Sequence, residues 1–97
     1  MALILKGNTS TGVTTNALQT ESNLRNLIIT NKTGGAVTLN LTIGNGNINV
    51  SICPENVQLQ NGQSYADQNI LFQVGEFLIM TVTGSCDYYF DFEISAS

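Results

Sequence analysis

The sequence contains no histidine and no tryptophan, and its cations are limited to Lys6, Arg25 and Lys32. Without imidazole, the chain lacks the commonest general base and the commonest metal ligand, which argues against an enzyme. Three cations against seven acidic residues give a net charge of −4 and leave no basic patch, whereas a nucleic-acid binder needs several phosphate contacts. We therefore expect no catalytic residue, no cofactor, no metal site and no nucleic-acid partner.

Long apolar runs are also missing. None approaches the ~20 residues that a membrane-spanning helix needs, so we expect no membrane partner. Only four apolar residues, Ala2 to Leu5, precede Lys6, which is too short for the apolar region of a signal peptide. The two cysteines, Cys53 and Cys86, are too few for a disulfide scaffold. In a reducing cytoplasm we expect free thiols, with a Cys53–Cys86 disulfide as the alternative.

What the chain does contain is an apolar core and an uncharged polar surface. Hydrophobic residues make up 42% of its 97 residues, which is too apolar for a disordered chain and fits a single domain. Only 10% of the residues are charged, while Asn, Thr, Ser and Gln together supply 36. When another protein covers such a surface, few charged groups lose their contact with water, so the composition favours packing against other copies.

The hydrophobic pattern has a period of two, which is typical of half-buried β-strands. Strands are predicted at 2–6, 24–31, 37–43, 48–52, 70–74, 78–83 and 88–94, with a further short apolar pair at Val57 and Leu59. Only residues 14–27 could contain a helical turn. Glycine and asparagine between the strands predict hairpin turns at 31–35, 44–47, 61–62 and 84–85.

About seven or eight strands at this spacing predict an all-β fold, a single antiparallel β-sandwich. Strand count favours an Ig-like topology, but the chain has no tryptophan for an Ig core, and a jelly roll is the alternative. We divide the chain into an N-terminal strand and polar arm, residues 1–23, and a β-sandwich domain, residues 24–97. Residues 7–23 are either an irregular connection or an arm that orders against another subunit, with the first strand pairing across the interface.

Two groups of residues are candidates for sites. Asp87, Asp91 and Glu93 share one face of the last strand, where residues two apart stand about 7 Å from each other. Such a pair could flank a glycosidic bond or share Ca²⁺, but no Asp-rich loop completes an oxygen cage, and we interpret the face as a solvated one. Tyr89, and Tyr65 after it, could stack on a sugar ring, unless these rings belong to the core.

Four tripeptides fit the glycosylation pattern Asn-X-Ser/Thr. They start at Asn8, Asn31, Asn40 and Asn49. Because the chain has 12 Asn and 18 Ser or Thr, chance alone produces several such tripeptides. Asn40 and Asn49 also lie within predicted strands, which suits glycosylation badly. We interpret all four as a consequence of composition.

Several short motifs follow one another from residue 27 onward. They are the turn and strand start Thr30–Leu39 (TNKTGGAVTL), a P-x-N-V-x-L-x-x-G-x-S pattern from Pro54 to Ser64, the V-G-E-x-L pattern of Val74–Leu78, and an aromatic, acidic C-terminal strand. This layout, over about 70 residues, resembles small β-sandwich structural proteins of tailed bacteriophages. The resemblance implies a virion component: a capsid auxiliary or decoration protein, or a piece of head fibre or tail. The family has no catalytic residues to carry over.

The sequence thus predicts a non-enzymatic structural component of a phage virion, a capsid auxiliary or decoration protein. Its expected partners are itself, as a homo-oligomer, and other virion proteins such as the capsid. Its expected location is the virion, assembled in the host cytoplasm. The alternative is a carbohydrate- or receptor-binding module, with a glycan held at Tyr89 or Tyr65.

Overall fold

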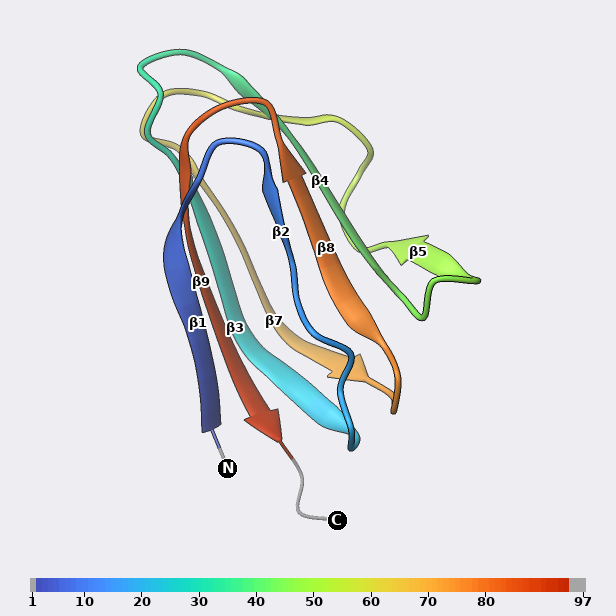
Figure 1. Cartoon of the computed structure of the whole chain (residues 1–97). Coiled ribbons are helices and arrows are strands. Elements are labelled where there is room, and N and C mark those ends of the chain that lie inside the picture. The colour runs from blue at the N-terminus through green and yellow to red at the C-terminus, as the bar shows by residue number, and fades with distance from the viewer. Residues whose placement is uncertain (1, 95–97) are drawn as a thin grey trace.

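Alternating apolar and polar side chains build two antiparallel β-sheets, which a computed structural model describes over residues 2–94 (Figure 1). Sheet A has the strand order β1 (Ala2–Thr9), β9 (Cys86–Ile94), β3 (Ser22–Asn31) and β7 (Ser64–Phe72). Sheet B has the order β2 (Gly12–Thr14), β8 (Phe77–Val82), β4 (Val37–Gly44) and β5 (Asn49–Ser51), and β6 (Val57–Leu59) also pairs with β4. No helix occurs among residues 2–94, and so none that is long and apolar enough to cross a membrane.

The predicted all-β sandwich is confirmed, and the strand order selects between its two candidate topologies. Consecutive strands cross between the sheets, except that β4 is followed by β5 and β6 in the same sheet. The resulting orders, 1-9-3-7 and 2-8-4-5, are those of a jelly roll. In an Ig-like sandwich the first two strands would be neighbours in one sheet, whereas β1 and β2 here belong to different sheets.

The core lies between the sheets and is formed by one side of each long strand. Leu24, Leu27 and Ile29 of β3 are fully buried, as are Phe90 and Phe92 of β9. The rings of Phe72 and Phe92 meet edge to face with their centroids 5.4 Å apart. Since alternate residues point outward, the polar members of each strand are left on two outer sheet faces.

The predicted turns occur, but most of them connect the sheets instead of closing hairpins. Gly34, Gly46 and Gly62 have positive φ values of 87°, 95° and 78°, which a tight turn requires. Only the turn at 44–47 joins two strands that pair with each other, β4 and β5. The hairpins expected at 31–35, 61–62 and 84–85 were wrong, because turn chemistry reverses the chain without deciding which sheet the next strand enters.

Some strands were missed where the sequence is polar. β2 and residues 64–69 of β7 lack apolar alternation, and both are edge strands with one neighbour each among the described strands. A bulge in β3 at Leu24/Asn26 lies near Asn69 of β7, which has a positive φ of 56°. The possible helical turn within residues 14–27 is absent. β1 and β2, inside the segment 1–23, pair with β9 and β8 of the same chain.

Candidate interaction surfaces

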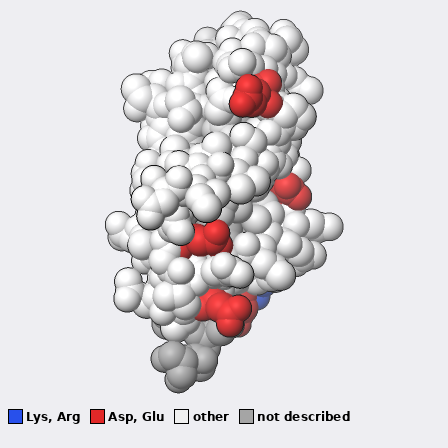
Figure 2. All heavy atoms as spheres, turned by 90° about the vertical axis from the view of Figure 1, so that its right-hand side faces the viewer, with Lys and Arg blue, Asp and Glu red and all other residues white. Residues whose placement is uncertain are grey.

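The outer side of sheet B has no charge. In the described part of the chain, the five strands of this sheet contain no Lys, Arg, Asp or Glu. We call its outer side the neutral face; it includes Gly12, Thr14, Thr38, Asn40, Thr42, Asn49, Ser51, Gln58, Phe77, Ile79 and Thr81. Figure 2 shows this side of the molecule, mostly uncharged, with separate acidic spots and almost no cationic surface.

Several polar groups of the neutral face already bond to one another. The Gln58 amide donates to the Thr38 hydroxyl at 2.6 Å. The Asn40 side chain accepts from the backbone N–H of Asn56 at 2.8 Å and donates to the Asn56 side-chain oxygen at 3.2 Å. Because these groups keep their partners when water leaves, covering the face costs less than covering unpaired polar groups.

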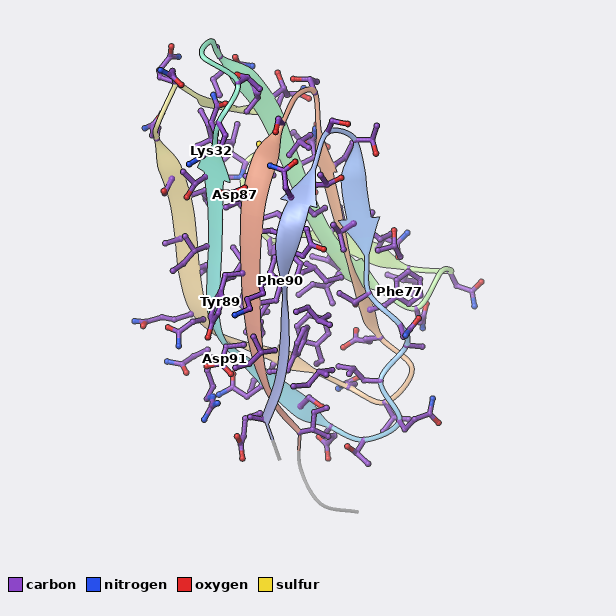
Figure 3. The ribbon with its side chains drawn as sticks, turned by 60° about the vertical axis from the view of Figure 1, so that its left-hand side comes forward. Lys32, Phe77, Asp87, Tyr89, Phe90 and Asp91 are labelled. Carbon is purple, nitrogen blue, oxygen red and sulfur yellow. The ribbon has the colours of Figure 1, made fainter. Side chains whose placement is uncertain are left out.

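The charged strand residues lie in sheet A, where the predicted carboxylates share the outer side of β9. Asp91 and Glu93 both contact the Arg25 guanidinium, at 2.8 and 3.2 Å. Asp87 lies 3.7 Å from the Lys32 ammonium and accepts a bond of 2.9 Å from the Asn8 amide. The bond to Asp91 is the main cause that raises the pKa of Arg25. Figure 3 shows Asp87, Tyr89 and Asp91 along β9.

These ion pairs bear on what the carboxylates do chemically. Arg25 and Lys32 hold the three carboxylates in ion pairs, so their oxygen atoms are engaged with side chains of the neighbouring strand and turn. No group of three His, Cys, Asp or Glu residues with metal-binding spacing occurs among residues 2–94. The arrangement therefore orders the outer side of β9 and binds it to β3 and to the β3–β4 turn.

The two candidate sugar-stacking rings are placed differently. Tyr65 faces inward, its hydroxyl donating to the Ile52 carbonyl at 3.5 Å, and burial raises the pKa of its phenol. Tyr89 faces outward and is half-buried between Lys6 and Ile28 of the adjacent strands. A shallow depression of about 350 Å³ lies between β3 and β7, lined by Asn26, Leu27, Ile28, Ala66, Asp67 and Gln68; Tyr89 does not line it but pairs with Ile28, which does.

Both cysteines are core residues. Cys53 and Cys86 are buried, and neither forms a disulfide, as expected for free thiols. Burial raises the pKa of each thiol above its ordinary value. The raised pKa keeps both sulfurs protonated and poorly nucleophilic at neutral pH.

One polar residue was underestimated from the sequence. Asn31, noted there as a turn residue and a possible glycosylation site, is fully buried. Its amide donates to the carbonyls of Gly35 and Leu59 at 2.5 and 2.8 Å, and its oxygen accepts from the Thr33 N–H and hydroxyl at 2.9 and 2.8 Å. The side chain thus ties the β3–β4 turn to β6, and glycosylation at this position is sterically excluded in the folded protein.

Exposed aliphatic side chains gather in two places. Ile48 and Val50, in and after the β4–β5 turn, are 72% and 59% exposed, and Leu71 and Val74 around the β7–β8 connection are 76% and 63% exposed. Pairing of Gly44 with Phe77 places these two connections at the same end of the sandwich. The second place is β1, whose Leu3 and Ile4 are 37% and 48% exposed.

Comparison with known proteins finds likeness in structure only. No protein-family model and no curated protein matches the sequence. A chain in the structure of infectious bursal disease virus, Gx strain, superposes with a TM-score of 0.54 at 12% identity, covering 97% of this chain and 33% of the viral one. This chain therefore spans about a third of that viral chain.

Two Drosophila domains are similar over nearly their whole length. The nucleoplasmin-like N-terminal domain of FKBP39 superposes with a TM-score of 0.57 at 9% identity, covering 100% of this chain and 93% of that domain. The core of Drosophila NLP, described for its pentamer formation and histone binding, superposes with a TM-score of 0.54 at 10% identity, covering 91% and 96%. At such identities the likeness shows the fold alone: an all-β sandwich shared with a viral chain and with nucleoplasmin-like domains.

Proposed function

We propose that this protein is a non-enzymatic structural component of a virus particle and that it acts through contacts with other proteins. The observation that carries the proposal is the neutral face. A partner that covers the strand residues of this face removes no charged group from water, provided that it leaves the separate acidic spots of Figure 2 exposed, whereas burying an unpaired charge costs several kcal/mol. The uncharged composition of the whole chain supports the same interpretation.

The finer proposal is a bacteriophage capsid auxiliary or decoration protein, with its own copies and the capsid as partners and the virion as its location. Two observations support it. The motifs from Thr30 to Leu78 resemble those of small phage structural proteins, and the fold is shared with a chain of a virus particle. The likeness to a domain described as pentamer-forming supports the homo-oligomer.

The absence of enzymatic activity is also part of the proposal. The groups that acid–base or nucleophilic chemistry would use are engaged elsewhere: Asp91 and Glu93 contact Arg25, and the thiols of Cys53 and Cys86 are buried with raised pKa values. A protonated core thiol is a poor nucleophile, and these carboxylates already serve as ion-pair partners of Arg25.

The proposal is tested by placing a charge on the neutral face. Thr81 is exposed on β8, between β2 and β4, so Thr81→Lys would put an ammonium in the centre of the face. Gln68→Lys, at an exposed position of β7 on sheet A, adds the same charge to the other side. We expect wild-type protein and Gln68→Lys to cosediment with purified particles and Thr81→Lys to remain in the supernatant. Equal binding of both variants, or no binding by wild type, would contradict the proposal.

A carbohydrate-binding module is the second candidate, supported by the depression between β3 and β7, which is lined by Asn26 and Gln68 and whose lining residue Ile28 pairs with Tyr89. A shallow polar hollow next to an aromatic ring suits a sugar. A glycan array probed with wild type and Tyr89→Ala tests it. Signals lost in the variant would favour this function, and an array without signals would remove it.

A further inference from the structure

The first strand is an unprotected sheet edge. Among the described strands, β1 has a single neighbour, β9, and nothing covers its other side (Figure 1). It is eight residues long and contains one charge, Lys6. The opposite edge of sheet A, β7, carries Asp67 and a positive φ at Asn69, two features that discourage pairing with another strand. β1 has no residue with a positive φ, and its one charge, Lys6, follows four apolar residues, Ala2 to Leu5, so its first half is a template for strand addition.

The first half of β1 is also incompletely covered from within. Leu3 pairs with Phe92 and belongs to the inner side of sheet A, yet it is 37% exposed while Phe92 is 1% exposed. Ile4, on the outer side, is 48% exposed. Two large aliphatic side chains thus lie side by side at the open edge, one on each side of the sheet.

We propose that this edge binds a second copy of the same chain: β1 pairs antiparallel with β1 of the other copy across a two-fold axis at Leu5, joining the two A sheets into one of eight strands. The inference deepens the proposed function, because it names the surface through which the structural protein self-associates. A strand that pairs with itself makes an isologous contact, which closes as a dimer.

The sequence of β1 fits itself best in this register. With the axis at Leu5, residues 2–8 of both copies pair, Leu3 faces the other copy's Gly7, and Ile4 faces its Lys6. An axis at Lys6 would place the two ammonium groups directly opposite each other, which is destabilising. An axis at Ile4 would pair only residues 2–6.

Shape and charge agree with this register. Gly7 has no side chain, and the Tyr88 ring lies over it, with the phenol oxygen 3.0 Å from where a Cβ would stand, so the exposed Leu3 of the second copy would pack against that ring. Ile4 is in register with Asp91 on β9, so Lys6 of one copy would lie in the same cross-strand row as Asp91 of the other. The incoming ammonium would thus lie on the same outer side as the Asp91 carboxylate of its partner, an arrangement of opposite charges.

Register-specific cross-linking tests the inference. Directly opposed residues of antiparallel strands have Cα atoms about 4.5–5.5 Å apart, within the range of a disulfide. Under mild oxidation, an equimolar mixture of Ile4→Cys and Lys6→Cys should give a covalent dimer. Either variant alone should not, because each new thiol then faces a native side chain. The wild type is the control, since Cys53 and Cys86 are buried. A mixture that fails to cross-link, or equal cross-linking of one variant alone, would overturn this register.

A second pair of variants tests the edge without cysteine chemistry. Ile4→Lys adds a charge to the edge, and Ile28→Lys adds the same charge at a 42% exposed position of the central strand β3, on the same side of the sheet. Light scattering over a concentration series should show self-association weakened about tenfold or more by Ile4→Lys and unchanged by Ile28→Lys. Circular dichroism checks that both variants are folded.

The outcomes separate this inference from the proposed function. Undiminished self-association of Ile4→Lys, or a wild type that stays monomeric at every concentration, would overturn the β1 contact. Cosedimentation of wild type, but not of Thr81→Lys, with particles would still support the structural role. Failure of the wild type to bind particles would contradict that role, even if the β1 dimer formed.

Discussion

Replacing Asn31 with alanine tests whether a single buried side chain holds one end of the sandwich together. The substitution removes four hydrogen bonds made by a side chain with no exposed surface. The backbone of the same residue bonds to Gln63 and Gly62 in the β6–β7 turn, so two sheet-crossing connections meet at this position. Loss of the side chain should therefore destabilise the whole fold.

The size of this loss of stability depends on which hydrogen-bond partners of Asn31 can bond to water instead. Leu59 is 2% exposed, so its carbonyl loses its bond to the Asn31 amide without replacement, at about 1–3 kcal/mol. Thr33 and Gly35 lie in an exposed turn, and their groups are rehydrated at a net cost of about 1 kcal/mol. We expect a total near 3 kcal/mol, or a fall in Tm of roughly 15 °C for a domain of this size.

The assay is urea and thermal unfolding followed by far-ultraviolet circular dichroism. Asn47→Ala, at an exposed position of the β4–β5 turn, is the matched control and should change stability by less than about 0.5 kcal/mol. A loss below about 1 kcal/mol for Asn31→Ala would refute the reasoning, because that is the effect of an ordinary solvent-exposed hydrogen bond.

Three further predictions follow from the packing and the charges. Burial raises the pKa of Cys53 and Cys86 above the ordinary value of 9.0. The stability that the two protonated thiols confer is therefore complete below that pH, and it falls as the pH rises through the higher pKa values of the folded protein. Urea midpoints should drop between neutral pH and about pH 10, and thiol labelling should be slow without denaturant. Arg25→Ala should cause a small loss of stability at low salt that disappears at about 1 M NaCl, measured by the same unfolding assay. Gly44→Ala should lower the free energy of unfolding by about 2 kcal/mol or more, because its Cβ would collide with the β4–β5 turn. Gly35→Ala, with open space around the new methyl group, should be tolerated in the same unfolding assay. A larger loss of stability for Gly35→Ala than for Gly44→Ala would contradict the packing.

Strict alternation made most of the strands predictable. The period-two patterns at 37–43 and 88–94 match β4 and β9 closely, because each strand buries one side in the core. The first half of β7 has no such pattern and was missed. Local turn chemistry could not predict which sheet each strand joins, since the same glycine turns occur in hairpins and in connections between sheets.

The surfaces were predictable in kind but not in position. Low charge and abundant threonine indicated a surface suited to packing, yet only strand pairing shows that the charged strand residues fall in sheet A and leave sheet B neutral. Asn31 was missed as a buried residue because its partner Leu59 lies 28 residues away. The three carboxylates were predicted to share a face, but their cations come from β3 and the β3–β4 turn, which the sequence alone does not place beside β9.

A protein that is built into a virus particle must be present in purified particles, and mass-spectrometric quantification in gradient-purified particles measures this. Particles are collected from cultures that express the chain, and its amount is compared with that of the major shell protein. We expect the chain to comigrate with intact particles at a constant ratio across the peak and between preparations. Absence from the particle fractions, with the chain recovered in the soluble fraction, would contradict it.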